Sequence, residues 1–173
     1  MKLLSKTLLL CAGLSLAACT NAGRFDDTSS TSMGGSGAGT GDFAAGSASD
    51  PSSPAYFQQA VGDRVLFSLN EYTLSPEGRA TLDGQAGWLL ANREYNALIE
   101  GHADERGTRE YNLALGARRA NSVQEYLVSR GVPENRLRVI SYGKERPIEI
   151  CSTEACYMKN RRAVTVISVV PTS

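Results

Sequence analysis

The sequence contains one histidine, His102, and no second cluster of nitrogen or sulfur ligands that would complete a zinc site. A catalytic zinc ion needs three protein ligands and an open position, so zinc hydrolase chemistry is disfavoured. The sequence also lacks a Gly-x-Ser-x-Gly segment and a reactive-cysteine context. These absences argue against an enzyme, and we expect no cofactor or metal. His102 is most simply a packed residue that makes hydrogen bonds.

An excess of charge of one sign is also missing, because the chain has 18 basic and 18 acidic residues. The basic residues include Lys2 and Lys6, whereas the first eighteen residues contain no acid. From Cys19 onward, 16 basic residues therefore face 18 acidic residues, a net charge of −2. A broad basic surface is excluded, and we expect no nucleic-acid partner.

The apolar run near the N-terminus is too short to span a bilayer as a permanent helix. Basic MKLLSK precedes apolar TLLLCAGLSL, a pattern typical of a secretory signal. Leu16-Ala17-Ala18-Cys19 follows and resembles a bacterial lipoprotein signal, in which residues 1–18 are removed and the Cys19 thiol is acylated. The alternative is a simple secretory signal, with Cys19 incidental. Thr20 stands where inner-membrane retention signals have Asp, which favours the outer membrane, with the domain facing the periplasm.

Large apolar residues are scarce from Thr20 to Ala55, where Gly, Ser, Ala, Thr and Asp predominate. Such a segment cannot bury enough surface to offset the entropy lost on ordering. We therefore predict that residues 19–55 are a lipidated Cys19 followed by a disordered tether. About 36 flexible residues have a root-mean-square span of roughly 30–35 Å. The folded domain is expected over residues 56–173.

Strands and helices are predicted to alternate through this domain. Apolar and β-branched runs predict strands at 65–69, 97–101, 137–143 and 163–169. Capping and stop signals predict helices at 75–92 and 108–130, and a short third helix near 154–160. This order indicates an α/β (α+β) sandwich, in which helices cover one face of a small mixed sheet.

Two cysteines, Cys151 and Cys156, remain after Cys11 leaves with the signal and Cys19 takes lipid. Export implies an oxidising compartment, which favours a disulfide between them that closes a small loop. A metal site is the alternative, but two thiols without a nearby histidine form a poor ligand set.

The helix predicted at 108–130 carries an apolar stripe, which we expect to face the sheet. The stripe consists of Leu113, Gly116, Ala117, Ala120, Val123 and Leu127, with Gln124 inside it. Arg118 points away from this stripe, whereas Arg119 and Asn112 lie on its flank. From there Arg119 either reaches a ligand held near the preceding loop or forms a structural salt bridge.

The loop before this helix, residues 102–107, is dense in charge and enters a helix N-terminus, which favours anions. Asp104 and Glu105 could act as an acid/base pair, as in a glycosidase, but adjacent side chains diverge in direction. Binding fits better. Asp104 can hold an ammonium group and Arg119 a carboxylate, with an added amide from Asn112, so the pattern suits the zwitterionic end of an amino acid.

Three segments carry a resemblance to a known family: IEGHADERGTREYNLALGARRANSV, ISYGKERP and KNRRAV. Over about residues 61–169 the chain resembles the peptidoglycan-associated lipoproteins (Pal), which have an OmpA-like C-terminal domain of βαβαβ(β) order. The resemblance implies non-covalent binding of peptidoglycan through the diaminopimelate residue of its stem peptide. It also implies TolB and other Tol–Pal components as partners, and a role in linking outer membrane to cell wall during division.

The same resemblance assigns the binding residues. The family's aspartate, arginine and asparagine fall on Asp104, Arg119 and Asn112, and its Asn-Arg-Arg motif adds Asn160 and Arg161. It also implies triacylation of Cys19.

The chain departs from the family at one corner of the expected site. Pal relatives commonly have Phe-Asp-x-Asp after the first strand, where this chain has Phe67-Ser68-Leu69-Asn70. Asn70 can hydrogen-bond but cannot pair with an ammonium group. Alternatively, Ser68 and Asn70 only close a turn before the helix.

Two other functions compete with wall binding. The charged loop could bind a protein partner, which would make the chain an envelope interaction module without wall binding. It could also belong to an enzyme acting on peptidoglycan, with Asp104 or Glu105 as the acid, although the sequence shows no nucleophile or metal set for it.

Overall fold

The computed structural model describes residues 46–169. The signal at 1–18, the lipidation site Cys19 and most of the predicted tether lie outside the described residues. The described residues belong to one compact unit. Within residues 46–169, no helix has both the length and the apolarity that a membrane span requires.

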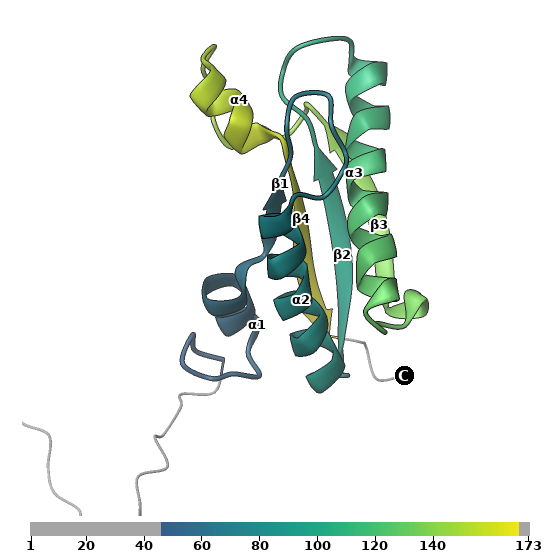
Figure 1. Cartoon of the computed structure of the whole chain (residues 1–173). Helices are drawn as coiled ribbons and strands as arrows, with labels where there is room; N and C mark the ends of the chain where they lie inside the picture. Colours follow the sequence, from purple (N-terminus) through teal and green to yellow (C-terminus); the bar gives the residue numbers. More distant parts are fainter. Residues whose placement is uncertain (1–45, 170–173) are drawn as a thin grey trace, which may run out of the picture. The chain divides into compact units, whose positions relative to one another are not determined.

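A four-stranded mixed sheet forms the centre of this unit (Figure 1). In chain order the strands are β1 (Arg64–Leu66), β2 (Tyr95–His102), β3 (Leu137–Gly143) and β4 (Arg162–Val169). Their spatial order is β1-β4-β2-β3, with β2 and β3 parallel and the other pairs antiparallel.

Two long helices, α2 (Pro76–Ala91) and α3 (Arg109–Ser129), cover one face of the sheet (Figure 1). The prediction of a small mixed sheet with helices on one face is confirmed. The shorter elements are α1 (Pro54–Tyr56), the π-helical turn η1 (Phe57–Gly62), the 3₁₀ turn η2 (Glu134–Arg136) and α4 (Glu154–Asn160).

The predicted start and stop signals of the long helices are present. The Ser75 hydroxyl accepts a hydrogen bond from the Gly78 N–H before α2, and Thr108 does the same for Tyr111 before α3. Each bond satisfies an amide that has no partner inside the helix. Past the end of α3, Gly131 adopts a φ of 95°, which a glycine accommodates without steric cost.

The first strand is shorter than predicted. It ends at Leu66 rather than Leu69, because the chain leaves the sheet and turns through Ser68 to Asn70. Asn70 has a φ of 57°, in the left-handed region that Asn tolerates better than most side chains. This turn brings the segment between β1 and α2 towards α3.

The packed structure also begins earlier than the predicted boundary at residue 56. Residues 46–55 were assigned to the tether, yet Ser53 is buried and caps α1 through a hydrogen bond from the Tyr56 N–H. The Trp88 indole N–H donates to the Pro51 carbonyl at 2.8 Å. These small residues cover the edge of an aromatic cluster, in which Trp88 contacts Phe57 and Tyr95. Their order therefore comes from the core that they cover.

Two glycines let α3 lie directly on β2. A Cβ atom added to Gly116 would lie 2.8 Å from the Gly101 carbonyl oxygen, and one added to Gly101 would overlap the Gly116 carbonyl. Neither backbone can yield without separating the helix from the strand. Close contact here fixes the position of the loop that joins β2 to α3.

Gly101→Ala is therefore expected to lower the free energy of unfolding by at least about 1–3 kcal/mol, the usual cost of overpacking. Gly87→Ala in α2 is the matched control, because a Cβ there meets no atom within 4 Å. That change should raise stability by about 0.5–1 kcal/mol through helix propensity. Urea denaturation measures both, and equal effects of the two substitutions would contradict the close-contact account.

Cys151 and Cys156 form a disulfide, as predicted for an exported chain. The bridge closes a short loop that includes the start of α4. Next to it, the Asn160 amide group is fully buried and bonds to the backbone of Ile148 and Glu149. The bridge and these bonds together hold the segment between β3 and α4.

Candidate functional site

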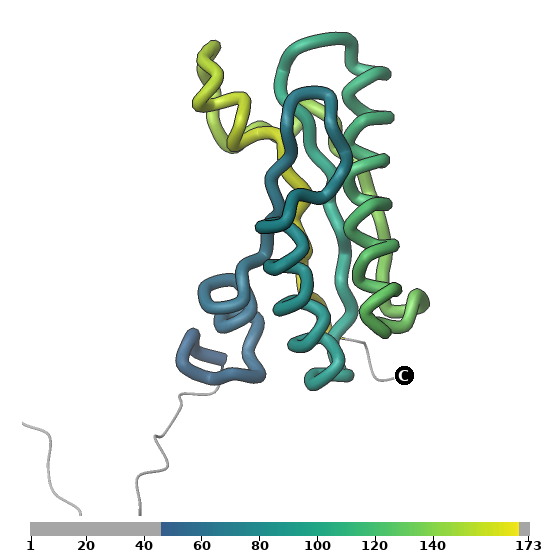
Figure 2. The backbone as a smooth tube through the Cα atoms, viewed as in Figure 1, coloured from purple at the N-terminus to yellow at the C-terminus, as the bar shows by residue number. Residues whose placement is uncertain are grey.

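Two loops meet at one end of the sheet (Figure 2). One loop, residues 67–75, joins β1 to α2, and the other, residues 103–108, joins β2 to α3. The first turns of α3 and the junction of α4 with β4 complete this end. Most of the predicted site residues lie here.

The face of α3 that meets the sheet differs from the predicted stripe. The buried residues include Asn112, Leu115 and Arg119, whereas Leu113 is 48% exposed. The buried face is rotated by roughly 60° from the predicted one, at 100° per residue. The wheel treated the polar Asn112 and Arg119 as flank residues, but both find hydrogen-bond partners inside the protein.

Arg119 is fully buried and holds the two loops together. Its guanidinium group donates to three backbone carbonyls: Glu71 at 2.8 Å, His102 at 2.8 Å and Ser68 at 3.1 Å. Burial lowers the pKa of Arg119 to about 10, partly offset by the negative charge of Asp104. Arg119 therefore stays positively charged at neutral pH. Three bonds leave two of its five N–H donors for other acceptors.

Asp104 is a buried carboxylate between two arginines. Its Oδ2 atom accepts hydrogen bonds from Arg106 at 2.7 Å and from Arg161 at 3.1 Å. Burial raises the pKa of Asp104, but the hydrogen bonds from these arginines outweigh burial and bring the pKa below its ordinary value. Asp104 is thus ionised at neutral pH, and its negative charge also acts on Arg119. Arg106 and Arg161 both pair with Glu154 as well.

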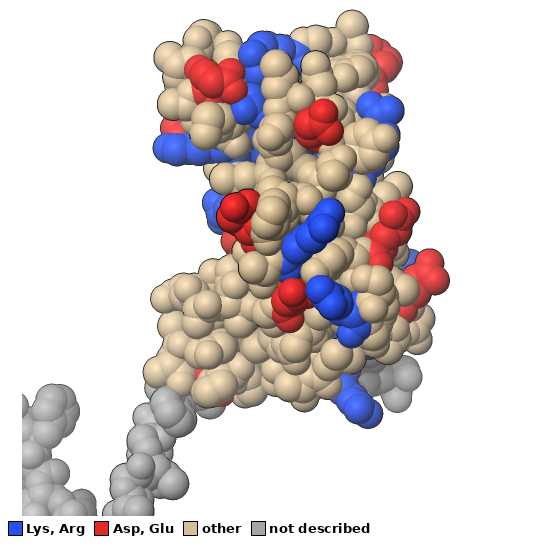
Figure 3. Space-filling view, viewed as in Figure 1, with Lys and Arg blue, Asp and Glu red and all other residues tan. Residues whose placement is uncertain are grey.

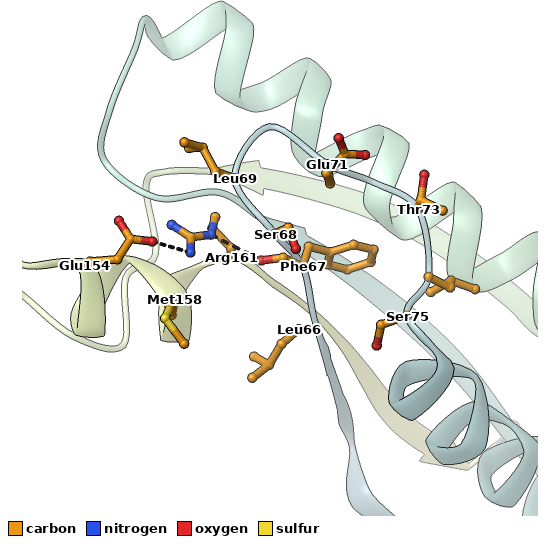
Figure 4. A pocket seen from close by; sticks show the side chains of 11 residues that line it. Leu66, Phe67, Ser68, Leu69, Glu71, Thr73, Ser75, Glu154, Met158 and Arg161 are labelled. Carbon is orange, nitrogen blue, oxygen red and sulfur yellow. Dashed lines mark hydrogen bonds and ion pairs between the residues drawn. The ribbon is translucent and has the colours of Figure 1, made fainter.

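Arg161 connects the site to α4 (Figure 4). Its side chain is 4% exposed, and it donates to the Phe67 carbonyl, to Asp104 and to Glu154 at 2.6 Å. Figure 4 shows this side chain between Glu154 and Phe67, at the edge of a pocket of about 530 Å³. Arg161 lies beside Asp104, and its bonds are directed to protein groups.

Arg106, which bonds to Asp104, also lines a groove beside the start of α3. The groove has a volume of about 620 Å³ and is lined by Leu69, Asn70, Arg106, Gly107, Thr108 and Tyr111. The Tyr111 hydroxyl donates to the Asn70 side-chain oxygen at 3.4 Å. Asn70 therefore lines a solvent-open groove, where it can offer its amide to a ligand.

Asn112 and Asn160 hold two backbone segments around the site in place. The Asn112 amide is buried and donates to the Arg106 carbonyl at 2.7 Å, which fixes the 103–108 loop. Asn160 holds the segment before α4 in the same manner. Neither amide is directed into the groove, so the structure gives both residues the position of loop supports.

Sequence reasoning missed Arg106, Glu154 and Tyr157. Arg106 bonds to Asp104, lies 3.5 Å from Glu154 and places its guanidinium carbon 4.3 Å from the centre of the Tyr157 ring. A charge at the fourth residue of a solvent-exposed loop gives no distinctive signal in the sequence. Only the pairing of that loop with α4, some 50 residues later, shows that Arg106 belongs to the site.

His102 is buried beside the site, but its side chain is not bonded to it. Within residues 46–169 neither ring nitrogen has a hydrogen-bond partner, although Nε2 lies 3.7 Å from a Glu100 oxygen. Burial, followed by the charges of Arg162 and Arg146, lowers its pKa to about 4. The expectation of a packed histidine holds, whereas the expected hydrogen bonding is not seen.

Because the pKa of His102 is lower in the folded than in the unfolded state, folding favours its neutral form. This contribution is complete above about pH 6.5 and is lost as the pH falls from 6.5 through about 4. We expect stability to fall by about 1–3 kcal/mol more in the wild type than in His102→Asn between about pH 7 and about pH 4. Urea unfolding of both proteins at both pH values measures the difference. Parallel losses would show that His102 does not titrate in this way.

Basic and acidic side chains are scattered over the face seen in Figure 3, with neither sign forming an extended area. This agrees with the balanced composition. Among residues 46–169, no three His, Cys, Asp or Glu side chains are grouped to hold a metal ion. The site within this range is therefore a cluster of ion pairs beside an open groove, suited to binding a ligand that carries both charges.

Fold and site together define a small α/β domain with a charged loop at one end of its sheet. The sequence pattern of the OmpA family matches residues 66–161, more than half of the chain, so the chain belongs to the OmpA family. This family is not an enzyme family, and the chain is not an enzyme.

Curated relatives agree. The "Peptidoglycan-associated lipoprotein" of Rhizobium meliloti (strain 1021) is 56% identical over 120 residues, covering 69% of this chain and 68% of the relative. The protein of the same name from Mesorhizobium japonicum is 44% identical over 159 residues, covering 92% of this chain and 89% of the relative.

Solved structures show the same fold. The crystal structure of the peptidoglycan-associated lipoprotein from Burkholderia pseudomallei has a TM-score of 0.62 and 37% identity, covering 69% of this chain and 98% of that one. The C-terminal domain of Helicobacter pylori MotB has a TM-score of 0.58 at 22% identity, covering 63% of this chain and 86% of that one, which is a likeness of fold alone.

Proposed function

We propose that this chain is an outer-membrane lipoprotein that binds peptidoglycan non-covalently through the diaminopimelate residue of the stem peptide. The observation that carries the proposal is the buried, ionised Asp104 beside a groove and within the field of Arg119. The names of the relatives, which are peptidoglycan-associated, support it. The domain acts as a passive clamp.

The chemistry of diaminopimelate fits this cluster. Its free end carries an ammonium group and a carboxylate on one carbon atom, so a matching site needs a fixed acid and a fixed base. Asp104 takes the ammonium group, and the remaining N–H donors of Arg119 take the carboxylate. Because Arg119 is buried, the 67–75 loop shifts to admit the ligand. Such charge-assisted hydrogen bonds are about twice as strong as neutral ones.

The other predicted binding residues have supporting roles in this proposal. Asn70 adds a hydrogen bond from the wall of the groove. Asn112 holds the 103–108 loop, Asn160 holds the segment before α4, and Arg161 keeps Asp104 ionised. The loss of the two family acids at Ser68 and Asn70 leaves Asp104 to bind the ammonium group.

The lipid anchor and the tether complete the mechanism. Acyl chains on Cys19 hold the protein in the outer membrane, with the domain facing the periplasm. Stable anchoring needs more than one chain, which triacylation supplies. The residues between Cys19 and the packed unit give the domain its reach. Many copies in one membrane, each binding the wall weakly, together hold it with high avidity, because binding by one copy keeps its neighbours near the wall.

Membership in the Tol–Pal system, with TolB as a partner and a role in cell division, is part of the same proposal. An exposed apolar cluster favours a second, protein-binding activity. Ile148, Ile150 and Met158 are 48%, 92% and 51% exposed around the disulfide-closed loop. Wall binding makes no use of them, so a protein partner can bind there without competing for Asp104.

Sedimentation with purified peptidoglycan tests the proposal. The chain from Thr20 onward, which lacks the lipidated cysteine, should sediment with walls that contain diaminopimelate and remain in solution with walls that contain lysine instead. Lysine lacks the distal carboxylate that Arg119 is proposed to bind. Equal sedimentation with both walls would rule out recognition of diaminopimelate, and absence from both pellets would favour the protein-interaction module.

A further inference from the structure

The Asp104 carboxylate is covered by Arg106, whose side chain is 39% exposed. The Arg106 guanidinium donates to Asp104 Oδ2 at 2.7 Å, and its backbone N–H donates to Oδ1 at 3.2 Å. Arg106 also lines the groove through which a ligand would approach. Any incoming ammonium group must therefore take a place that Arg106 already holds.

The two arginines at Asp104 differ in their freedom to leave. Arg161 is buried and fixed by further bonds to the Phe67 carbonyl and to Glu154. Arg106 is on the solvent side and, while it bonds to Asp104, also contacts two residues of α4. Its guanidinium Nη1 lies 3.5 Å from Glu154 Oε2, and its guanidinium carbon lies 4.3 Å from the centre of the Tyr157 ring. It can therefore leave Asp104 without losing every favourable contact.

We propose that Arg106 is an internal competitor, which occupies Asp104 in the free protein and, when the ligand ammonium group binds, releases Asp104 while it keeps its contacts with Glu154 and Tyr157. This inference rests on the proposed function, since it assigns a competing cation to the same carboxylate. In the protein without ligand, Asp104 stays paired with Arg106, so its buried carboxylate keeps a partner of opposite charge. Ligand affinity is therefore set by the difference in free energy between two ion pairs of Asp104, one with Arg106 and one with the ligand ammonium group.

Competition predicts opposite effects for two substitutions. Arg106→Gln removes the competitor and should tighten binding of a diaminopimelate stem peptide by about 2- to 5-fold, the range expected for a half-exposed ion pair. Glu154→Gln removes the negative charge that holds Arg106 after it has released Asp104, and it should weaken binding by a similar factor. This weakening should disappear when Arg106 is also changed to Gln. A merely structural role would give no gain in affinity for Arg106→Gln.

Calorimetric titration of the chain from Thr20 onward with the stem peptide measures these affinities. Arg109→Gln is the matched control, because Arg109 lies three residues after Arg106 but pairs with Glu145 at 3.3 Å. The affinity of this variant should equal that of the wild type. If the wild type binds and Arg106→Gln binds equally or more weakly, the competition is refuted and the wall-binding proposal stands. If neither protein binds, both proposals are wrong. If Arg106→Gln binds the peptide and the wild type does not, the result would support competition strong enough for Arg106 to block the ligand in the wild type.

Discussion

Asp104→Asn should abolish most wall binding while the protein stays folded. Asparagine has nearly the same shape and still accepts hydrogen bonds from Arg106 and Arg161, but it carries no charge for an ammonium group. A hydrogen bond to a charged partner contributes about 1.5–3 kcal/mol, so we expect affinity for a diaminopimelate peptide to fall by about 10- to 100-fold. Circular dichroism should show an unchanged secondary structure.

Glu105→Gln is the matched control for this substitution. Glu105 is the next residue, is exposed, and makes no side-chain hydrogen bond or salt bridge among the described residues. The change removes the same unit of charge from the same loop and should leave affinity within about 2-fold, since an exposed charge contributes little. Equal losses in both variants would mean that the loop attracts its ligand only through its overall charge.

Arg119→Ala should unfold far more easily than the wild type, in addition to losing its ligand. The substitution leaves three backbone carbonyls, at Ser68, Glu71 and His102, without their donor and opens a cavity beneath the 67–75 loop. Breaking a buried charged network costs about 3–5 kcal/mol. Urea denaturation should show this as a lower transition midpoint, and the loop-bridging role predicts that Arg119→Lys recovers only part of the loss.

Arg118→Ala is the control for Arg119. The neighbouring arginine is exposed, and among residues 46–169 its guanidinium carbon lies 5.4 Å from the centre of the Tyr72 ring. Its removal should change stability by no more than about 0.5–1 kcal/mol. Because Arg119→Ala alters stability as well as binding, Asp104→Asn is the more informative variant for wall binding. A stability of Arg119→Ala close to that of the wild type would contradict the bridging role.

The elements of the fold were largely predictable because their signals are local. Ser75-Pro76 and Thr108 cap their helices, Gly131 ends α3, and the alternation of strands and helices specifies the layers. The start of the packed unit was not predictable from composition. Residues near Ser53 are small and polar, and they become ordered by covering Trp88, which comes much later in the sequence.

The site was predictable in part. Asp104 stands out as an acid in a strand-to-helix loop, and the family resemblance pointed to Asp104, Arg119 and Arg161, which the structure brings to one end of the sheet. The environment of Arg119 was not predictable, because its acceptors are carbonyls 17 to 51 residues away in sequence. A helical wheel places Arg119 only on the flank of the apolar stripe. The environment of Arg106, whose second set of partners lies on α4, was not predictable either.

Calorimetric titration of the chain from Thr20 onward with a diaminopimelate stem peptide tests the central claim most directly, with the lysine peptide as the matched ligand. The account predicts binding of the diaminopimelate peptide alone, lost in Asp104→Asn and kept in Glu105→Gln. Binding of both peptides with equal affinity, or undiminished binding by Asp104→Asn, would contradict it.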